Sequence, residues 1–302
     1  MELLQLYYFQ MAARCEHVSA AAAKLNIAQP ALSQTIKRLE NELGTPLFDR
    51  EGKHIRLNAY GRVFLKYTDT VLGALKDARS ELADMSDNPN AQISFSVQAA
   101  SSLLPDILEK FCGSHPDIHF NIIQSAAADD TAGDIDLTLH AAATFEDHPD
   151  NVLLLKEPLM VALPSNHPLA VQRQLNLCDL KDQSFASLCK GSNLYEITRY
   201  YCSLAGFEPQ ISLSCDNPQA FRQLLGLNMG IALVPAITWP DLTGSGIITR
   251  PVADICCQRY LLLSRKSARY LSRPAQLFAG FLEDYFGQLQ RPISPTGCRP
   301  LP

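Results

Sequence analysis

The sequence lacks the motifs on which several classes of enzyme depend. It has no GxGxxG or GxxxxGK[ST] segment for a nucleotide, no HExxH zinc motif, and no CxxC pair among its nine cysteines. It has no apolar run of the roughly 18 residues that a membrane-spanning helix needs. Its first residues show neither a basic start nor a cleavable apolar segment. We therefore expect a cytoplasmic protein that uses no metal and no cofactor.

The composition predicts a globular chain with an uneven charge distribution. The 302 residues are 47% hydrophobic and 19% charged, and a typical domain of about 150 residues predicts two domains. The net charge of −5 taken alone disfavours a nucleic-acid partner. Residues 1–90, however, hold 11 basic and 11 acidic residues, so the other 15 basic and 20 acidic residues carry the whole surplus. The N-terminal part therefore remains a candidate for binding DNA.

The first 60 residues predict short helices joined by a tight break. Ser19 is expected to cap a helix over 19–25, which Asn26 ends. A second helix is predicted over 29–43, with Pro30 in its first turn and Gly44 just past its end. Two helices joined in this way are typical of a helix-turn-helix. Strands at 47–50 and 54–57 around a glycine predict a wing.

The second of these helices has an apolar face and a polar face. Leu32, Ile36 and Leu39 mark the buried stripe. Glutamine and serine can bind base edges, and lysine and arginine suit phosphates. The candidate DNA-binding residues are Gln29, Pro30, Ser33, Gln34, Lys37 and Arg38 on the helix, and Arg50, Lys53 and Arg56 in the wing. An ordinary solvated helix face would contain the same residue types.

A long helix is predicted from Asn58 to Ser86. Apolar residues recur along it in steps of three and four: Tyr60, Phe64, Tyr67, Val71, Ala74, Ala78, Leu82 and Met85. Such a stripe on an isolated helix needs a partner, which favours dimerisation. Packing on the chain's own domains is the alternative.

After residue 91, strands alternate with helices, which predicts an α/β fold. Strands are expected at 93–97, 118–123, 135–139, 152–155, 159–163, 210–214, 231–234, 247–251 and 259–264. Helices are expected at 103–111, 192–205, 217–227 and 272–289.

Residues 1–65 resemble the winged helix-turn-helix of the LysR-type transcriptional regulators. The resemblance is carried by Phe9, Ser19, Ala21-Ala22, Leu25, Gln29–Ser33, Ile36, Leu39-Glu40, Leu43-Gly44, Pro46–Arg50 and Gly61. It continues more weakly to residue 290, through Gly133–Leu137 and Leu224–Pro235. Two departures stand out. Ala28 replaces the Ser or Thr that the family usually has, and 124–133 is short for the helix that the family usually has there.

The resemblance implies an all-α winged helix-turn-helix domain (1–58), a linker helix for dimerisation (59–90) and an α/β effector domain (91–302). The effector domain would have two lobes like a periplasmic binding protein, the first at about 91–160 and 267–290, the second at about 161–266. The implied protein is a transcriptional regulator, not an enzyme, controlled by a small molecule bound between the lobes. Its other partners would be double-stranded DNA with an interrupted palindrome, RNA polymerase, and further copies of the chain in a homodimer or homotetramer.

Two predicted helix starts offer sites for an anionic effector such as a carboxylate. Ser101 and Ser102 lie between a strand and a helix, where free backbone N–H groups and hydroxyls can bind an anion. Ser192 and Asn193 begin another helix in the same way. His140, directly after strand 135–139, is expected to face the cleft. Ordinary capping and turn chemistry would use the same residues.

Two alternatives to this interpretation stay open. The chain could be a metabolite-binding protein or a small-molecule enzyme whose N-terminal region serves only in assembly, and it would then show no salt-dependent affinity for DNA. A redox sensor would use Cys189, Cys202 or Cys215, since some family members sense oxidants through paired cysteines.

Overall fold

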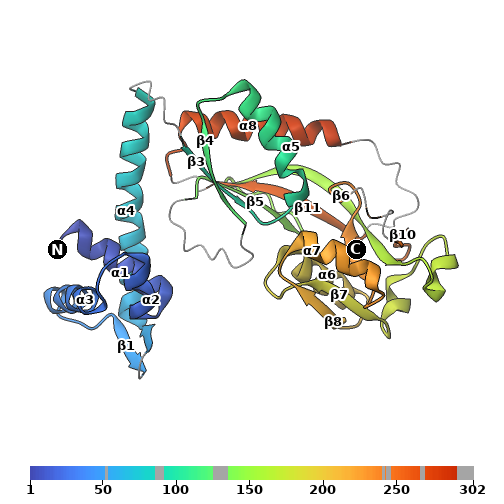
Figure 1. Ribbon diagram of the computed structural model, residues 1–302, viewed down its shortest axis with the longest axis horizontal. Coiled ribbons are helices and arrows are strands. Elements are labelled where there is room, and N and C mark those ends of the chain that lie inside the picture. Colours follow the sequence, from blue (N-terminus) through green and yellow to red (C-terminus); the bar gives the residue numbers. More distant parts are fainter. Residues whose placement is uncertain are drawn as a thin grey trace. The chain divides into compact units, whose positions relative to one another are not determined.

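The chain folds as two compact units. The structure, a computed structural model, describes residues 1–51, 54–85, 92–124, 135–239, 242, 246–265 and 269–290. The first unit contains the described residues up to Met85, and the second contains those from Gln92 (Figure 1). Across these ranges, no helix is both long and apolar enough to cross a membrane.

The first unit is a winged helix-turn-helix followed by a long helix. Its elements are α1 (Leu3–Cys15), α2 (Val18–Lys24), α3 (Gln29–Leu43), β1 (Phe48–Glu51), β2 (His54–Leu57) and α4 (Ala59–Met85). Phe9 of α1 is fully buried, and its ring centre lies 5.6 Å from that of Phe48 and 5.1 Å from that of Phe64. These rings tie the helices to the wing and to α4.

The N-cap of α2 differs from the sequence prediction, whereas the end of α3 agrees with it. The helix α2 begins at Val18, and His17 caps it because its Nδ1 accepts a hydrogen bond from the Ala20 N–H at 3.2 Å. The prediction that Ser19 is the cap is therefore wrong, since Ser19 lies inside the helix. Gly44 takes the expected left-handed conformation after α3, with φ at 70°. Ala28 precedes α3 without a side-chain cap, as its methyl group requires.

Two polar side chains and a glycine hold the wing against α3 and α4. The Glu40 carboxylate accepts from the Leu47 N–H at 2.8 Å, where the chain enters β1. The Asn58 side chain accepts from Gly61 N–H at 2.8 Å and donates to the Pro46 carbonyl at 2.9 Å. A Cβ atom on Gly61 would lie 2.2 Å from the Leu47 carbonyl oxygen. Only glycine therefore fits this close approach of α4 to the wing.

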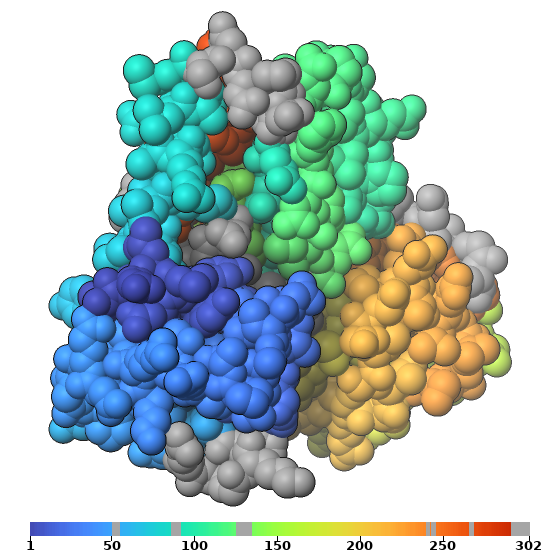
Figure 2. Space-filling model, turned by 60° about the vertical axis from the view of Figure 1, so that its left-hand side comes forward, coloured from blue at the N-terminus to red at the C-terminus, as the bar shows by residue number. Residues whose placement is uncertain are grey.

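The helix α4 carries an exposed apolar stripe. Its C-terminal half projects beyond the other helices of its unit (Figures 1 and 2). The exposed apolar side chains are Tyr60, Val63, Tyr67, Val71, Leu75, Leu82 and Met85. Phe64, which the spacing placed in this stripe, instead packs against Phe9 in the core of its own unit.

The second unit is built on a seven-stranded mixed sheet. The strand order is β10-β6-β11-β5-β3-β4, and β9 pairs with β6. The strands are β3 (Gln92–Val97), β4 (His119–Ile123), β5 (Leu137–Ala142), β6 (Asn151–Pro164), β9 (Ala232–Pro235), β10 (Ile247–Pro251) and β11 (Gln258–Ser264). A separate parallel pair is formed by β7 (Ser184–Leu188) and β8 (Gln210–Cys215).

Helices pack around these strands to make two lobes. In the first lobe, α5 (Leu104–Ser114) and α8 (Arg273–Leu289) lie side by side on one face of the sheet (Figure 1). Phe278 of α8 contacts Phe111 of α5, Phe95 of β3 and Phe120 of β4, with ring centres 4.8 to 5.0 Å apart. The second lobe contains α6 (Asn193–Leu204) and α7 (Pro218–Leu224) with β7, β8, β9 and β10.

The strand β6 connects the lobes and differs from the prediction. The sequence predicted two strands, but residues 151–164 form one strand, whose first half pairs with β11 and whose second half pairs with β9 and β10. The return to the first lobe, expected near residue 267, comes earlier because β11 already pairs with β5. The short, buried β7 was not predicted. The short 124–133 segment lies outside the described residues from position 125 on.

We expect Gly61→Ala to destabilise the first unit by about 1–3 kcal/mol, because the new methyl group would clash with backbone that cannot easily move. Urea unfolding of the full-length chain, followed by far-UV circular dichroism, measures the loss. The control is Gly113→Ala in α5, where a new Cβ meets nothing within 4 Å. Equal stability of the two variants would contradict the assigned close approach.

Candidate functional site

The predicted DNA-binding face of α3 is open in the first unit. Gln29, Pro30, Gln34, Lys37 and Arg38 are exposed, and Ser33 is half-buried with its hydroxyl accepting from Gln29 Nε2 at 3.4 Å. The helix holds its position through Leu32, Ile36 and Leu39, which are buried on the opposite side. Short and long polar side chains thus share one accessible helix face, as base and phosphate contacts require.

The wing presents one of its three predicted cations among the described side chains. Arg56 of β2 is exposed and pairs in register with Asp49 of β1. Arg50 belongs to β1, but its side chain is outside the described atoms, and Lys53 lies outside the described residues. The structure therefore leaves the roles of Arg50 and Lys53 as predictions.

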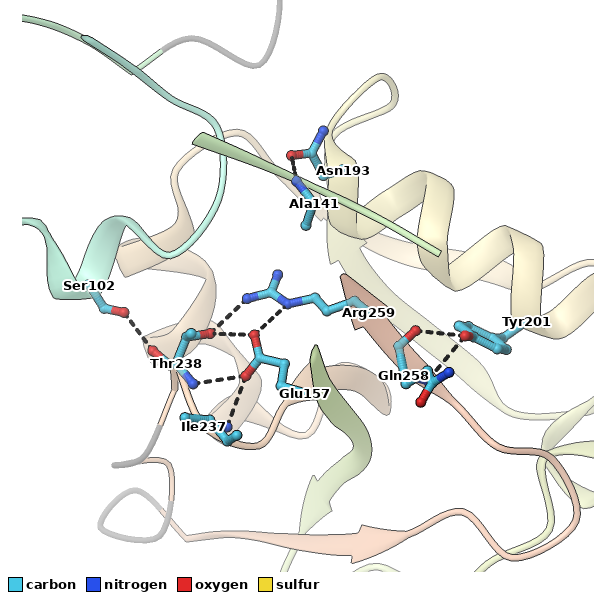
Figure 3. Close-up of polar contacts among 9 residues, drawn as sticks. All are labelled: Ser102, Ala141, Glu157, Asn193, Tyr201, Ile237, Thr238, Gln258 and Arg259. Atoms are coloured by element: carbon cyan, nitrogen blue, oxygen red, sulfur yellow. Dashed lines mark hydrogen bonds and ion pairs between the residues drawn. The ribbon is translucent and has the colours of Figure 1, made fainter. Parts of the chain in front are cut away.

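A buried ion pair lies where β6 passes from one lobe to the other (Figure 3). Glu157 of β6 and Arg259 of β11 are paired in register, and their side chains meet at 2.8 Å. They are 0% and 3% exposed. The Glu157 carboxylate also accepts from the N–H groups of Ile237 and Thr238, at 3.0 and 2.9 Å. Two opposite charges with these hydrogen bonds satisfy each other away from water.

Ser102 is attached to this junction. It lies in a single 3₁₀ turn, Ser101–Leu103, that follows Ala100 in the left-handed conformation (φ 54°) and leads into α5. The Ser102 hydroxyl donates to the Thr238 carbonyl at 2.7 Å (Figure 3). Ser101 shares the turn and is half-buried. The predicted helix-start site thus exists as a turn, with one of its hydroxyls already bonded.

Ser192 and Asn193 have different roles at the start of α6. Ser192 is buried and caps the helix, since its hydroxyl accepts from the Tyr195 N–H at 3.3 Å. Asn193 reaches to the first lobe, where its Oδ1 accepts from the Ala141 N–H of β5 at 2.9 Å (Figure 3). Two turns further on, the Tyr201 hydroxyl donates to the Gln258 carbonyl at 2.6 Å. Burial raises the pKa of Tyr201 to about 12, so the hydroxyl remains a donor.

His140 lies inside β5 rather than after it. Its Nε2 is 2.6 Å from the Ser264 hydroxyl, which in turn bonds Asn151. Partial burial lowers the pKa of His140 and favours the neutral ring. Thr138 and Ser264 are direct partners in the sheet, so His140 belongs to a polar group on the sheet surface. Its contact with an effector remains a prediction.

Two of the cysteines suggested for redox sensing are neighbours in the second lobe, since the Cys189 N–H donates to the Cys215 carbonyl at 2.8 Å and both residues are half-buried. Their redox role stays a prediction. Cys202 is fully buried in α6, and burial raises the pKa of its thiol to about 12, which opposes formation of the reactive thiolate. Within the described part of the chain, no three His, Cys, Asp or Glu side chains gather as metal ligands do.

Sequence reasoning missed Glu157, Thr238 and Arg259. A signal was present, because Glu157 shares a strand face with Leu155 and Leu159, and Arg259 shares one with Leu261 and Leu263. A charge on a strand face that is otherwise apolar needs a buried partner. Only the register of β6 and β11 shows that Glu157 and Arg259 are each other's partners.

Comparisons with known proteins assign both units. The family model described as "Bacterial regulatory helix-turn-helix protein, lysR family" matches residues 3–62, and "LysR substrate binding domain" matches residues 88–287. The chain belongs to the LysR family of transcriptional regulators. The transcriptional dual regulator GltC of Bacillus subtilis is 32% identical over 299 residues, which cover 96% of this chain and 99% of GltC. An uncharacterised regulator of the same organism, YybE, is 31% identical over 95% of this chain and 100% of YybE.

Solved structures of LysR regulators share the fold. Full-length OxyR from Pseudomonas aeruginosa aligns over 98% of this chain and 99% of its own, with a TM-score of 0.66 and 21% identity. Full-length CbnR, solved with its target DNA, aligns over 94% and 99%, with a TM-score of 0.57 and 20% identity. The winged helix-turn-helix and the two-lobed effector domain predicted from the sequence are thereby confirmed.

We expect Glu157→Gln to destabilise the second unit by about 3–5 kcal/mol, because it leaves the Arg259 charge buried without a counter-charge. Trp239 is the chain's only tryptophan and lies in this unit, so its fluorescence follows the urea unfolding of the full-length protein. Glu208→Gln, in the exposed pair with Arg199, is the matched control and should change stability little. A loss no larger than the control's would show that the Glu157 charge is not needed.

Proposed function

We propose that this LysR regulator binds operator DNA through the exposed face of α3 and through its wing, under the control of a small molecule held between its lobes. The observation that carries the proposal is the accessible group of Gln29, Ser33, Gln34, Lys37 and Arg38 opposite the buried stripe of α3. Glutamine can bond an adenine edge twice, and the two cations suit phosphates. The first unit thus offers side chains that can recognise bases and side chains that can position the protein on the DNA backbone.

The exposed stripe of α4 supports assembly of the chain as a homodimer or homotetramer. Tyr67, Val71 and Leu75 are all more than 40% exposed on one helix. Burying them against a second copy would remove this apolar surface from water. Two recognition helices in a dimer read half-sites about one DNA turn apart, so the target would be an interrupted palindrome. Promoter-bound regulators of this kind would act on RNA polymerase.

The effector we propose is a small anion with several acceptor oxygens, such as a carboxylate. The turn at Ser101 and Ser102 offers a hydroxyl and backbone N–H groups, and the Asn193 amide offers N–H donors from the other lobe. The surplus of acidic residues in the second unit does not prevent the binding of an anion, because the donors at the Ser101–Ser102 turn and at Asn193 would contact the anion directly. The fold is shared with the effector binding domain of QuiR, solved with shikimate, at a TM-score of 0.55 and 23% identity over 66% of this chain and 98% of that one.

We expect Gln34→Ala to weaken binding to the specific operator by about 1–3 kcal/mol while leaving nonspecific binding unchanged, because it removes a base contact. Lys37→Ala should weaken both alike and flatten the salt dependence by about one phosphate contact. Electrophoretic shift of DNA from upstream of the gene, at two salt concentrations, measures both effects. Lys181→Ala, an exposed cation of the second unit, is the charge-matched control. The proposed face is wrong if both α3 variants bind as the control does.

Placing a charge in the α4 stripe should separate the subunits. We expect Val71→Asp to shift the full-length protein to monomers at micromolar concentration, because a carboxylate would be buried in the apolar seam without a partner. Sedimentation equilibrium measures the mass, and Glu81→Gln on the same helix removes a charge as the control. An unchanged assembly in Val71→Asp would exclude this stripe as the interface.

A further inference from the structure

The Ser102 hydroxyl is the first-lobe end of a chain of hydrogen bonds that leads to the buried charges (Figure 3). It donates to the Thr238 carbonyl at 2.7 Å. The Thr238 N–H and hydroxyl donate to the two oxygens of Glu157, at 2.9 and 3.0 Å, and the same hydroxyl accepts from Arg259 Nη2 at 2.7 Å. Every polar group of Thr238 is therefore bonded, and the carbonyl that receives Ser102 is held in one place.

Thr238 is followed by the only tryptophan of the chain. The Trp239 ring is buried. The centre of the indole ring lies 6.1 Å from the centre of the Phe221 ring and 5.6 Å from the guanidinium carbon of Arg222. A nearby cation and a buried environment both affect indole fluorescence. A shift of the Thr238 backbone would move Trp239 relative to both residues, so its emission reports on the Ser102 bond.

We propose that the hydrogen bond from the Ser102 hydroxyl to the Thr238 carbonyl is a latch between the lobes. Glu157 and Arg259 are positioning residues that hold Thr238, the acceptor of this bond, in place. This proposal deepens the proposed effector site and rests on it. The Ser102 hydroxyl has one O–H to donate, so an effector oxygen that accepts a hydrogen bond from it replaces the bond to Thr238. The Thr238–Trp239 segment is then released from the Ser101–Leu103 turn, while Glu157 still holds it to β6. Effector binding and the latch compete for one hydroxyl, so the ligand shifts the lobes between two states.

The latch itself is tested in the full-length, ligand-free protein. Ser102→Ala removes the donor, and Ser102→Thr restores a hydroxyl at the same position. Loss of one hydrogen bond should shift the population toward the released state by roughly fivefold. We expect Ser102→Ala to change the Trp239 emission maximum and raise its quenching by acrylamide, and Ser102→Thr to behave as wild type. Ser114→Ala, at the exposed far end of α5, is the control, and circular dichroism checks that each variant is folded.

Thr238→Val tests the positioning by the buried pair. It keeps the carbonyl that Ser102 uses but removes the hydroxyl that Glu157 and Arg259 hold. We expect the same change in Trp239 quenching as in Ser102→Ala, and little further change when the two substitutions are combined, since both act on one bond. Fully additive effects would overturn the positioning role.

The regulatory part is tested by promoter output without added effector, which Ser102→Ala should change several-fold relative to wild type and Ser114→Ala. Wild-type quenching of Trp239 in Ser102→Ala would overturn the latch. An altered Trp239 with unaltered promoter output would overturn its regulatory role. Failure of the wild-type protein to bind its upstream DNA would instead overturn the proposed function, and the fluorescence comparison would still decide whether the latch exists.

Discussion

The arrangement of the second unit depends on the ion pair of Glu157 and Arg259. Both side chains are shielded from water at the point where β6 leaves one lobe for the other, so each charge is acceptable only with its partner in place. A buried pair contributes little net stability compared with apolar residues of similar size, but removing one partner is costly. Its main effect is therefore on geometry. It fixes the register of β6 and β11 and the course of the chain through Ile237 and Thr238.

Other contacts between the lobes follow from this fixed point. Asn193 and Tyr201 join α6 to β5 and β11 through backbone groups, and Ser102 joins the start of α5 to Thr238. Side chains that the sequence suggested as effector ligands, Ser102 and Asn193, thus already hold the lobes together. A ligand that accepts a hydrogen bond from the Ser102 hydroxyl must replace the bond to Thr238, whereas the Asn193 bond to Ala141 uses the amide oxygen and not its N–H donors. Binding at Ser102 is in this way coupled to the arrangement of the lobes.

Sequence reasoning succeeded where local rules decide the structure. The buried stripe of α3 and the glycine after it follow from helical spacing and from the left-handed conformation at Gly44. It failed where tertiary context decides. His17 displaced Ser19 as the cap, and Phe64 turned inward because Phe9 offered a core contact that spacing cannot reveal. The Glu157–Arg259 pair joins residues 102 positions apart, so only the register of the strands brings it to light.

A double-mutant cycle at the lobe junction tests the central role of this pair most directly. Glu157→Leu, Arg259→Met and the combined variant would be unfolded in urea, with Trp239 fluorescence as the signal. We predict a large loss of stability for each single variant and recovery of most of that loss in the combined variant, so that the coupling energy exceeds the loss of either single variant. Losses that simply add would show that the two charges do not depend on each other, and would contradict the central role of the pair.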